Sequence, residues 1–157
     1  MIIATYHANI RNETPPPIGP HNTDGMLVFS DGLVDEDLES FNATGFPMVL
    51  VHRTPPASLP IPSVTVENVE ITKKLVEHLI REHGRRRIVF LRGPVHQEDS
   101  VRRETGYKLA LEANGIPFDE NLVLSGEFER DIAYVVMNEF LNNGRSEERR
   151  VGKECRL

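Results

Sequence analysis

The chain has 157 residues and a formal net charge of −6 at pH 7, from 18 Lys and Arg against 24 Asp and Glu. A chain of this length forms one domain or pieces of two small lobes, and it can bury a core without disulfides or a metal. Its single cysteine, Cys155, excludes a disulfide framework and a zinc site of several thiolates. The acidic balance disfavours direct binding to nucleic acid, and no apolar run approaches the length of a membrane span. We therefore expect a soluble, cytoplasmic protein with no membrane partner, cofactor or metal.

Both ends of the chain differ from its middle. Residues 1–6 suit a short buried strand, whereas residues 11–22 contain four prolines and predict a loop or stiff linker. Residues 145–157 carry five basic and three acidic residues, and this charge of +2, taken from −6, leaves −8 for residues 1–144. The tail could be a solvated basic segment that binds an acidic partner. It also resembles the in-frame translation of a sequencing adapter, so we expect it to be disordered and the natural sequence to continue past residue 144.

Between these ends, short apolar runs alternate with amphipathic segments. Apolar runs of about four residues are typical of strands in a sheet buried on both faces. Strands that alternate with helices predict an α/β fold with parallel, doubly wound sheets. The expected strands are 26–29, 48–51, 63–66, 88–91 and 122–124, and the expected helices are 35–44, 69–83, 100–114 and 129–141.

Two of these helices have a distinct apolar face. Asn68 can cap helix 69–83, and Ser100 can cap helix 100–114. The residues that should face the core follow the helical period. They are Ile71, Leu75, Val76, Leu79 and Ile80 in helix 69–83, and Ile132, Val135, Val136 and Phe140 in helix 129–141.

Ligands of open α/β sheets bind beyond the carboxyl ends of the strands, which draws attention to Arg103 and Phe128. Arg103 lies near the start of its helix, on the line 103, 106, 107, 110 and 111 that should pack on the sheet. A guanidinium there suits vicinal hydroxyls or a carboxylate, although Arg103 could also be a surface residue paired with an acid such as Asp99. Phe128 follows a strand directly, and it could stack on a sugar or a base or contribute to ordinary packing.

The chain carries no motif that indicates catalysis or a metal site. His78 and His83 are five residues apart rather than four, and they lie on a solvated face, so they do not match a helical zinc site. No nucleophile elbow, P-loop or dinucleotide-binding glycine motif occurs. The acidic residues at 35–37 are explained most simply by the start of a helix, where negative charge is favourable beside the positive end of the helix dipole. The sequence therefore predicts no enzyme activity.

A series of short motifs keeps a fixed order along residues 24–144. They are Asp24–Val28, Pro47–Val51, Glu67-Asn68, His78-Leu79-Ile80, Gly84, Arg86-Arg87-Ile88, Gly93-Pro94, Arg103–Tyr107 and Gly126-Glu127-Phe128. In this order they resemble the lactose/galactose-repressor (LacI/GalR) family. Glu67 stands where that family commonly has Asp, and Arg85 stands where it usually has His.

The resemblance implies a periplasmic-binding-protein-like sensor of two Rossmann-like lobes. It implies a partial first lobe at 1–65, a partial second lobe at 66–144 and the separate tail at 145–157. A small effector, either a sugar or a purine-like molecule, would bind in the cleft between the lobes. Closure of the lobes would change the geometry of a homodimer and so the affinity of an attached headpiece for DNA. By motif position, the effector-binding residues are Arg103, Phe128, Asp99, Gln97, Asp31 and Ser30.

The expected function is effector sensing in a LacI/GalR-type transcriptional regulator. No helix-turn-helix precedes the domain in this sequence, so operator DNA would be bound only through a headpiece that is missing here. The alternative is a sugar-binding protein of a transport system with the same fold. The upstream reading frame distinguishes the two, because a regulator would show a helix-turn-helix and a transport protein would show a signal peptide.

Overall fold

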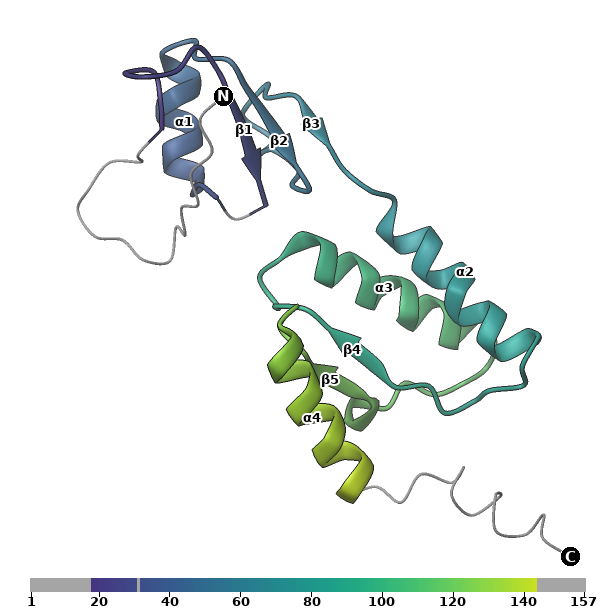
Figure 1. The fold of residues 1–157 in the computed structure, drawn as a ribbon. Coiled ribbons are helices and arrows are strands. Elements are labelled where there is room, and N and C mark those ends of the chain that lie inside the picture. The colour runs from purple at the N-terminus through teal and green to yellow at the C-terminus, as the bar shows by residue number, and fades with distance from the viewer. Residues whose placement is uncertain (1–17, 31, 144–157) are drawn as a thin grey trace, which may run out of the picture. The chain divides into compact units, whose positions relative to one another are not determined.

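The computed structural model describes residues 18–30 and 32–143 of the chain (Figure 1). The chain divides into two compact units. Unit 1 consists of Met1–Asn68 and Gln97–Arg102, and unit 2 consists of Val69–His96 and Arg103–Leu157. The predicted strand at 1–6 and the tail at 145–157 lie outside the described residues. Of the predicted loop at 11–22, residues 18–22 are described and form a turn in which the Asn22 N–H donates to the Gly19 carbonyl.

Unit 1 is built on a three-stranded parallel sheet. Strands β1 (Met26–Phe29) and β2 (Met48–Val51) are joined by helix α1 (Asp35–Ala43), and β2 continues through a loop to β3 (Ser63–Val64). The sheet order is β1-β2-β3, with Met26 opposite Met48 and Leu50 opposite Ser63. The buried core of this unit consists of Val28, Leu33, Leu38, Met48, Leu50 and Ile61.

The two faces of this sheet differ. Val28 is buried, whereas its neighbours Leu27 and Phe29 are 76% and 65% exposed. Successive residues of a strand point to opposite faces, so the described residues cover only the face that carries Val28. The expectation that these apolar runs are buried on both faces is therefore wrong for β1. Among the described residues, α1 is the one helix that connects strands of this sheet, and one helix covers one face.

Unit 2 has a two-stranded parallel sheet with helices on both faces. Strand β4 (Phe90–Arg92) pairs with β5 (Val123–Ser125), with Phe90 opposite Val123. Helix α3 (Glu98–Ala113) and the 3₁₀ helix η1 (Glu120–Leu122) connect them, and α4 (Arg130–Asn143) packs against β5. Phe90 stacks on Tyr107 of α3, whereas the adjacent Leu91 lies near Ala133 of α4, on the other face. This arrangement confirms the parallel, doubly wound fold class.

Helix α2 (Asn68–Arg81) belongs to unit 2 from Val69 onward and lies directly beside α3, so that the two helices run side by side (Figure 1). The predicted apolar stripe of α2 is too wide. Val76 and Ile80 are buried, but Ile71, Leu75 and Leu79 are exposed, because contact with a single neighbouring helix covers a narrow side. In α4, Ile132 and Val135 are likewise exposed rather than inward. No helix among the described residues is both long and apolar enough to cross a membrane.

Five predicted boundaries shift by two residues. Strand β3 ends at Val64 rather than residue 66, and β4 begins at Phe90 rather than residue 88. Helix α2 ends at Arg81 rather than residue 83, α3 begins at Glu98 rather than residue 100, and α4 ends at Asn143 rather than residue 141. Ser100 is consequently a buried residue of the first helical turn and not the cap of the helix. Strands β1 and β2 lie where the sequence pattern predicted them.

The close approach of α2 and α3 depends on Gly106. A Cβ at this position would lie 2.3 Å from the carbonyl oxygen of Val69 and 3.0 Å from the Cβ of Thr72. Because backbone atoms cannot move aside as a side chain can, only glycine fits this crossing.

We therefore expect Gly106→Ala to force the two helices apart and to lower the free energy of unfolding by about 1–3 kcal/mol. The measurement is chemical denaturation followed by circular dichroism. Glu112→Ala, on the exposed side of the same helix, is the matched control and should change stability by less than about 0.5 kcal/mol. Equal stability of the two variants would contradict this account of the helix crossing.

Candidate functional site

Backbone strain gathers at the carboxyl ends of the strands. The described chain has four non-glycine residues with positive φ, namely Ser30 (43°), His52 (60°), Glu127 (54°) and Phe128 (56°). Ser30 follows β1, His52 follows β2, and the other two follow β5. Left-handed backbone at such residues costs free energy and is typically retained where a loop has a function. The strained positions thus fall in the loops that the ligand rule selects.

Phe128 is the central side chain at this end of unit 2. A Cβ added at Gly93 would lie 2.2 Å from the Phe128 Cζ atom, so the ring rests directly on the Gly93 backbone. The Phe128 residue remains 53% exposed. The ring is therefore held on one side by the loop that follows β4 and offers apolar surface to solvent on the other.

Arg103 lies beside this ring. Its Cζ atom is 5.7 Å from the centroid of Phe128, within the range of a cation–π contact. The predicted inward line of α3 is confirmed, since Gly106, Tyr107, Ala110 and Leu111 are all buried. Arg103, one helical turn before this buried line, therefore stands at the end of α3 that meets Phe128.

Tyr107 fixes α3 to the sheet below Arg103. Its hydroxyl donates to the Ile88 carbonyl over 2.9 Å, and its ring stacks on Phe90 at a centroid distance of 5.0 Å. Burial raises the pKa of the Tyr107 hydroxyl, and the charge of Asp119 adds to this effect. The hydroxyl thus remains a neutral donor, which keeps the helix in place under Arg103.

A polar network joins the ends of β4 and β5 next to Phe128. Arg92 reaches Glu104 over 3.2 Å and donates to the Ser125 hydroxyl over 3.4 Å, and Ser125 donates to Glu127 over 2.7 Å. A hydrogen bond from Lys108 lowers the pKa of Glu104, and Arg92 adds to this effect against the opposing influence of burial. The network therefore brings one guanidinium and two carboxyl side chains together at the ends of the two strands.

A small pocket opens at the same place. It has a volume of about 260 Å³ and a mostly apolar lining. Its lining residues are Leu91, Arg92, Gly126, Phe128, Glu129, Arg130 and Ala133. A concave, mostly apolar surface that includes an aromatic ring is typical of small-molecule sites.

In unit 1, adjacent carboxylates join the first turn of α3 to the loop after β2 and to the first residue of α2. Asp99 accepts hydrogen bonds from the Asn68 amide and from His52 Nδ1, each over 2.8 Å. Glu98 accepts from the backbone N–H and the hydroxyl of Thr54, each over 2.6 Å. Burial would raise the pKa of Glu98, but the hydrogen bonds from Thr54 and the charges of Arg102 and Arg53 lower it overall.

The predicted effector-binding residues fall into two groups. Arg103 and Phe128 come together in unit 2, whereas Ser30, Gln97 and Asp99 belong to unit 1. Asp31 lies outside the described residues. The prediction missed His52, Arg92, Ser125 and Glu127 as individual residues, although all four lie in or beside loops that follow strands. In the part of the chain that the structure describes, no group of three or more His, Cys, Asp or Glu side chains could hold a metal ion.

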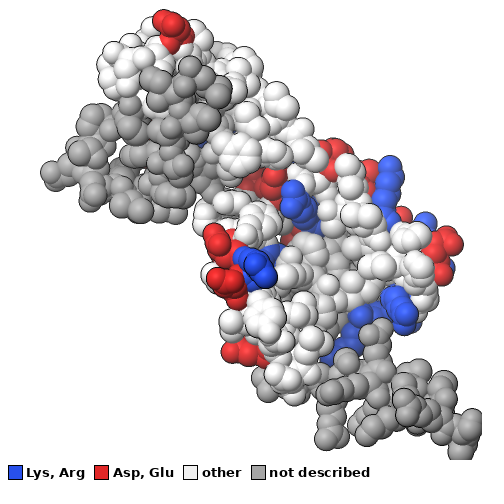
Figure 2. Space-filling view, viewed as in Figure 1, with Lys and Arg blue, Asp and Glu red and all other residues white. Residues whose placement is uncertain are grey.

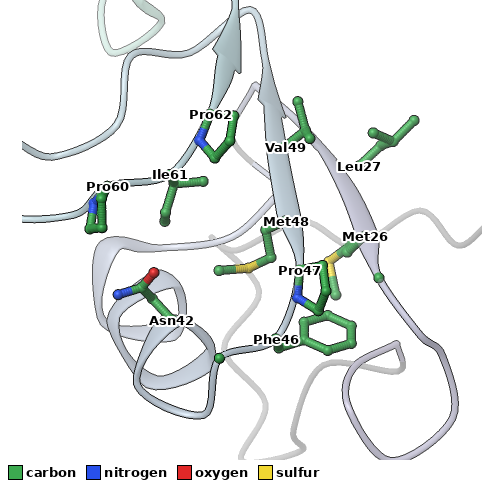
Figure 3. Close-up of a pocket in the computed structure, with 12 residues that line it drawn as sticks. Met26, Leu27, Asn42, Phe46, Pro47, Met48, Val49, Pro60, Ile61 and Pro62 are labelled. Carbon is green, nitrogen blue, oxygen red and sulfur yellow. The ribbon is translucent and has the colours of Figure 1, made fainter.

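A larger pocket lies at the opposite end of the unit 1 strands (Figure 3). It has a volume of about 590 Å³ and is lined by Met26, Phe46 and Met48 at the amino ends of β1 and β2, and by Ile61 of the loop before β3. Figure 3 shows mainly apolar side chains and prolines around it. Because ligands of such sheets bind at the carboxyl ends of strands, we do not assign the effector site to this pocket.

The carboxylate of Asp99 should contribute to the stability of unit 1. In Asp99→Ala, the amide of Asn68, which is 4% exposed, would lose an acceptor. We expect the free energy of unfolding to fall by about 1–3 kcal/mol. Glu39→Ala, an exposed acid of α1, serves as the control for loss of a carboxylate in the same unit. A loss no larger than that of the control, measured by urea denaturation, would show that these hydrogen bonds do not support the fold.

Comparison with known proteins supports the family inferred from the motifs. The family model described as periplasmic binding proteins and sugar binding domain of LacI family matches residues 17–147. The HTH-type transcriptional regulator CelR of Thermobifida fusca is 30% identical over 146 residues, covering 90% of this chain and 42% of that protein. The HTH-type transcriptional repressor PurR of Vibrio atlanticus is 29% identical over 119 residues, covering 75% of this chain and 35% of its own length.

Solved structures give the same result. The complex of the transcriptional regulator CelR with cellobiose has a TM-score of 0.65 at 32% identity, covering 78% of this chain and 38% of that one. The transcription regulator CcpA of Lactococcus lactis has a TM-score of 0.65 at 27% identity, covering 79% of this chain and 45% of that one. The chain thus spans less than half the length of these relatives. From its motifs, its fold and a family match over most of its length, the chain belongs to the LacI-type family of periplasmic binding proteins and sugar-binding domains.

Proposed function

We propose that the chain is the effector-sensing part of a LacI-type transcriptional regulator, and that Arg103 and Phe128 bind the effector. The observation that carries this proposal is that residues of three separate motifs, Gly93, Arg103 and Phe128, meet at the carboxyl end of the unit 2 sheet. The Phe128 ring rests on Gly93 and lies 5.7 Å from the Arg103 guanidinium. The regulators CelR and PurR among its relatives favour this role over the transport of a sugar, and over catalysis.

The chemistry of this site suits a sugar. An exposed aromatic ring can stack on the C–H face of a pyranose, which is apolar, and a guanidinium donates two parallel hydrogen bonds to neighbouring hydroxyls. Arg92, which lines the adjacent pocket, and its neighbours Ser125 and Glu127 add donors and acceptors at the ends of β4 and β5. A purine-like effector could also stack on Phe128, but it would offer fewer hydroxyls to Arg103.

Because the CelR relative was solved with cellobiose, we propose a glucose-containing disaccharide as the first effector to test. The pocket of about 260 Å³ beside Phe128 is of a size to hold one ring of such a ligand rather than both. The second ring would then extend toward the exposed face of Phe128.

Residues of unit 1 form the second part of the proposal. We propose Ser30, Asp31, Gln97 and Asp99 as the effector contacts that unit 1 contributes. Hydrogen bonds from His52 and Asn68 hold the Asp99 carboxylate in place at the start of α3. Its role would then combine positioning with a ligand contact.

DNA binding and dimer formation belong to the same proposal. On the face shown in Figure 2, Lys and Arg side chains of the described residues are interspersed with acidic ones and form no continuous basic stripe. A phosphate backbone is bound by clustered positive charge. We therefore propose that operator DNA is contacted by a separate headpiece of a dimeric regulator, and that effector binding changes its affinity.

The test is a titration of the chain with cellobiose and, separately, with a purine base, followed by NMR and calorimetry. We expect cellobiose to shift the signals of Phe128, Gly93 and the Arg103 side chain. Arg103→Lys keeps the charge but loses the planar fork of donors, and Phe128→Ala removes the stacking surface. Each should weaken binding by about ten- to hundredfold.

Two matched variants act as controls. Arg86→Lys changes an exposed arginine, and Tyr134→Ala removes an exposed aromatic ring of α4, so both should bind cellobiose like the unaltered chain. If the purine alone binds, with the same dependence on Phe128, the effector class is corrected. Binding of either ligand that is insensitive to both Arg103→Lys and Phe128→Ala would contradict the assignment of the site.

A further inference from the structure

Two imidazole rings meet at the carboxyl end of α2. His78 lies in the last turn of the helix, and His83 follows two residues after the helix ends at Arg81. Their Nε2 atoms are 3.2 Å apart. On a continuous helix, residues five apart point in different directions, so the two rings would not meet. Here the helix ends at Arg81, and the turn that follows brings His83 back beside His78.

The orientation of the rings matches that of two ligands of one metal ion. Their centroids are 4.9 Å apart, farther than the Nε2 atoms, so the nitrogens face each other and the rings diverge. The separation of 3.2 Å between the two Nε2 atoms is that of a ring-to-ring hydrogen bond. It is also close to the separation of two imidazole nitrogens that each bind one tetrahedral zinc ion at about 2.0–2.1 Å.

The surroundings are compatible with a bound cation. The carboxyl end of a helix carries partial negative charge, and His78 lies in that last turn. On the same helix face, Arg81 is paired with Glu77 over 3.2 Å and Lys74 is paired with Glu70 over 3.8 Å. The arginines at 85–87 oppose cation binding, but their charge is screened at physiological salt because they are exposed.

We infer that His78 and His83 form a two-ligand surface site for a divalent transition metal that prefers imidazole, such as Zn²⁺, Ni²⁺ or Cu²⁺. No cluster of three or more possible ligands occurs among the described residues, so water completes the coordination. Mg²⁺ and Ca²⁺ prefer oxygen ligands and should not bind here. The site precedes β4, whereas Phe128 follows β5, so it lies at the other end of the unit 2 sheet and is independent of effector binding.

The experiment is a calorimetric titration of the chain with zinc chloride at neutral pH, in a Cys155→Ser background that removes its single thiol. His78→Gln and His83→Gln each remove one proposed ligand. His21→Gln removes an exposed histidine of unit 1 and is the matched control. The ring proton signals of the histidines are followed by NMR during the same titration, and magnesium chloride replaces zinc in a parallel run.

We expect one zinc ion per chain, with selective shifts of the His78 and His83 ring signals. His78→Gln and His83→Gln should each lower the affinity for zinc by at least about tenfold, and His21→Gln should leave it unchanged. Circular dichroism should show all three variants folded, since both rings are exposed. Absence of zinc binding, binding that persists in both site variants, or equal binding of magnesium would overturn the inference.

Discussion

The contact between Phe128 and Gly93 is the constraint on which the proposed effector site depends. Any side chain at residue 93 would occupy the space of the ring, since even a Cβ would lie 2.2 Å from it. Phe128 reaches this position through two successive residues with positive φ, Glu127 and Phe128 itself. The surrounding contacts must offset the conformational free energy that this backbone costs. They include the hydrogen bond from the Ser125 hydroxyl to Glu127 and the hydrogen bond from the Gly126 N–H to the Arg92 carbonyl.

The position of Arg103 follows from the packing of α3. Tyr107 is fully buried and bonded to the Ile88 carbonyl, and Gly106 lets the helix approach α2. These two residues belong to the same short motif as Arg103, so one stretch of five residues both docks the helix and directs a guanidinium toward Phe128. The same five residues thus determine both the packing of α3 and the position of the proposed effector contact, so a shift of the helix would disturb both.

The parts that were predictable are those set by local pattern. Strands β1 and β2 follow from runs of four apolar residues, and the buried line of α3 follows from helical spacing. The proximity of Arg103 and Phe128 follows from a general rule, because a helix and a loop that meet at the carboxyl end of the same parallel sheet share an edge. The assignment of these residues to a ligand came from the family motifs and not from spacing alone.

The remainder depended on contacts between residues far apart in the sequence. Helix α3 starts before Ser100 because Glu98 is bonded to Thr54, which lies in a loop 44 residues away. Asp99 is held by His52 and Asn68, and neither partner has a spacing that marks it. His78 and His83 meet because the helix stops between them, a boundary that sequence patterns fix poorly.

The most direct test of the central claim is a measurement of contact between the effector and the Phe128 ring. With the ring protons of Phe128 labelled selectively, intermolecular nuclear Overhauser effects to a bound sugar would report stacking without relying on a loss of affinity. The account predicts contacts from the ring to protons on one face of a single pyranose, with Arg103 Hε near the neighbouring hydroxyl-bearing carbons. A sugar that binds the chain but shows no contact to Phe128, or that contacts only the apolar pocket at the amino ends of β1 and β2, would contradict it.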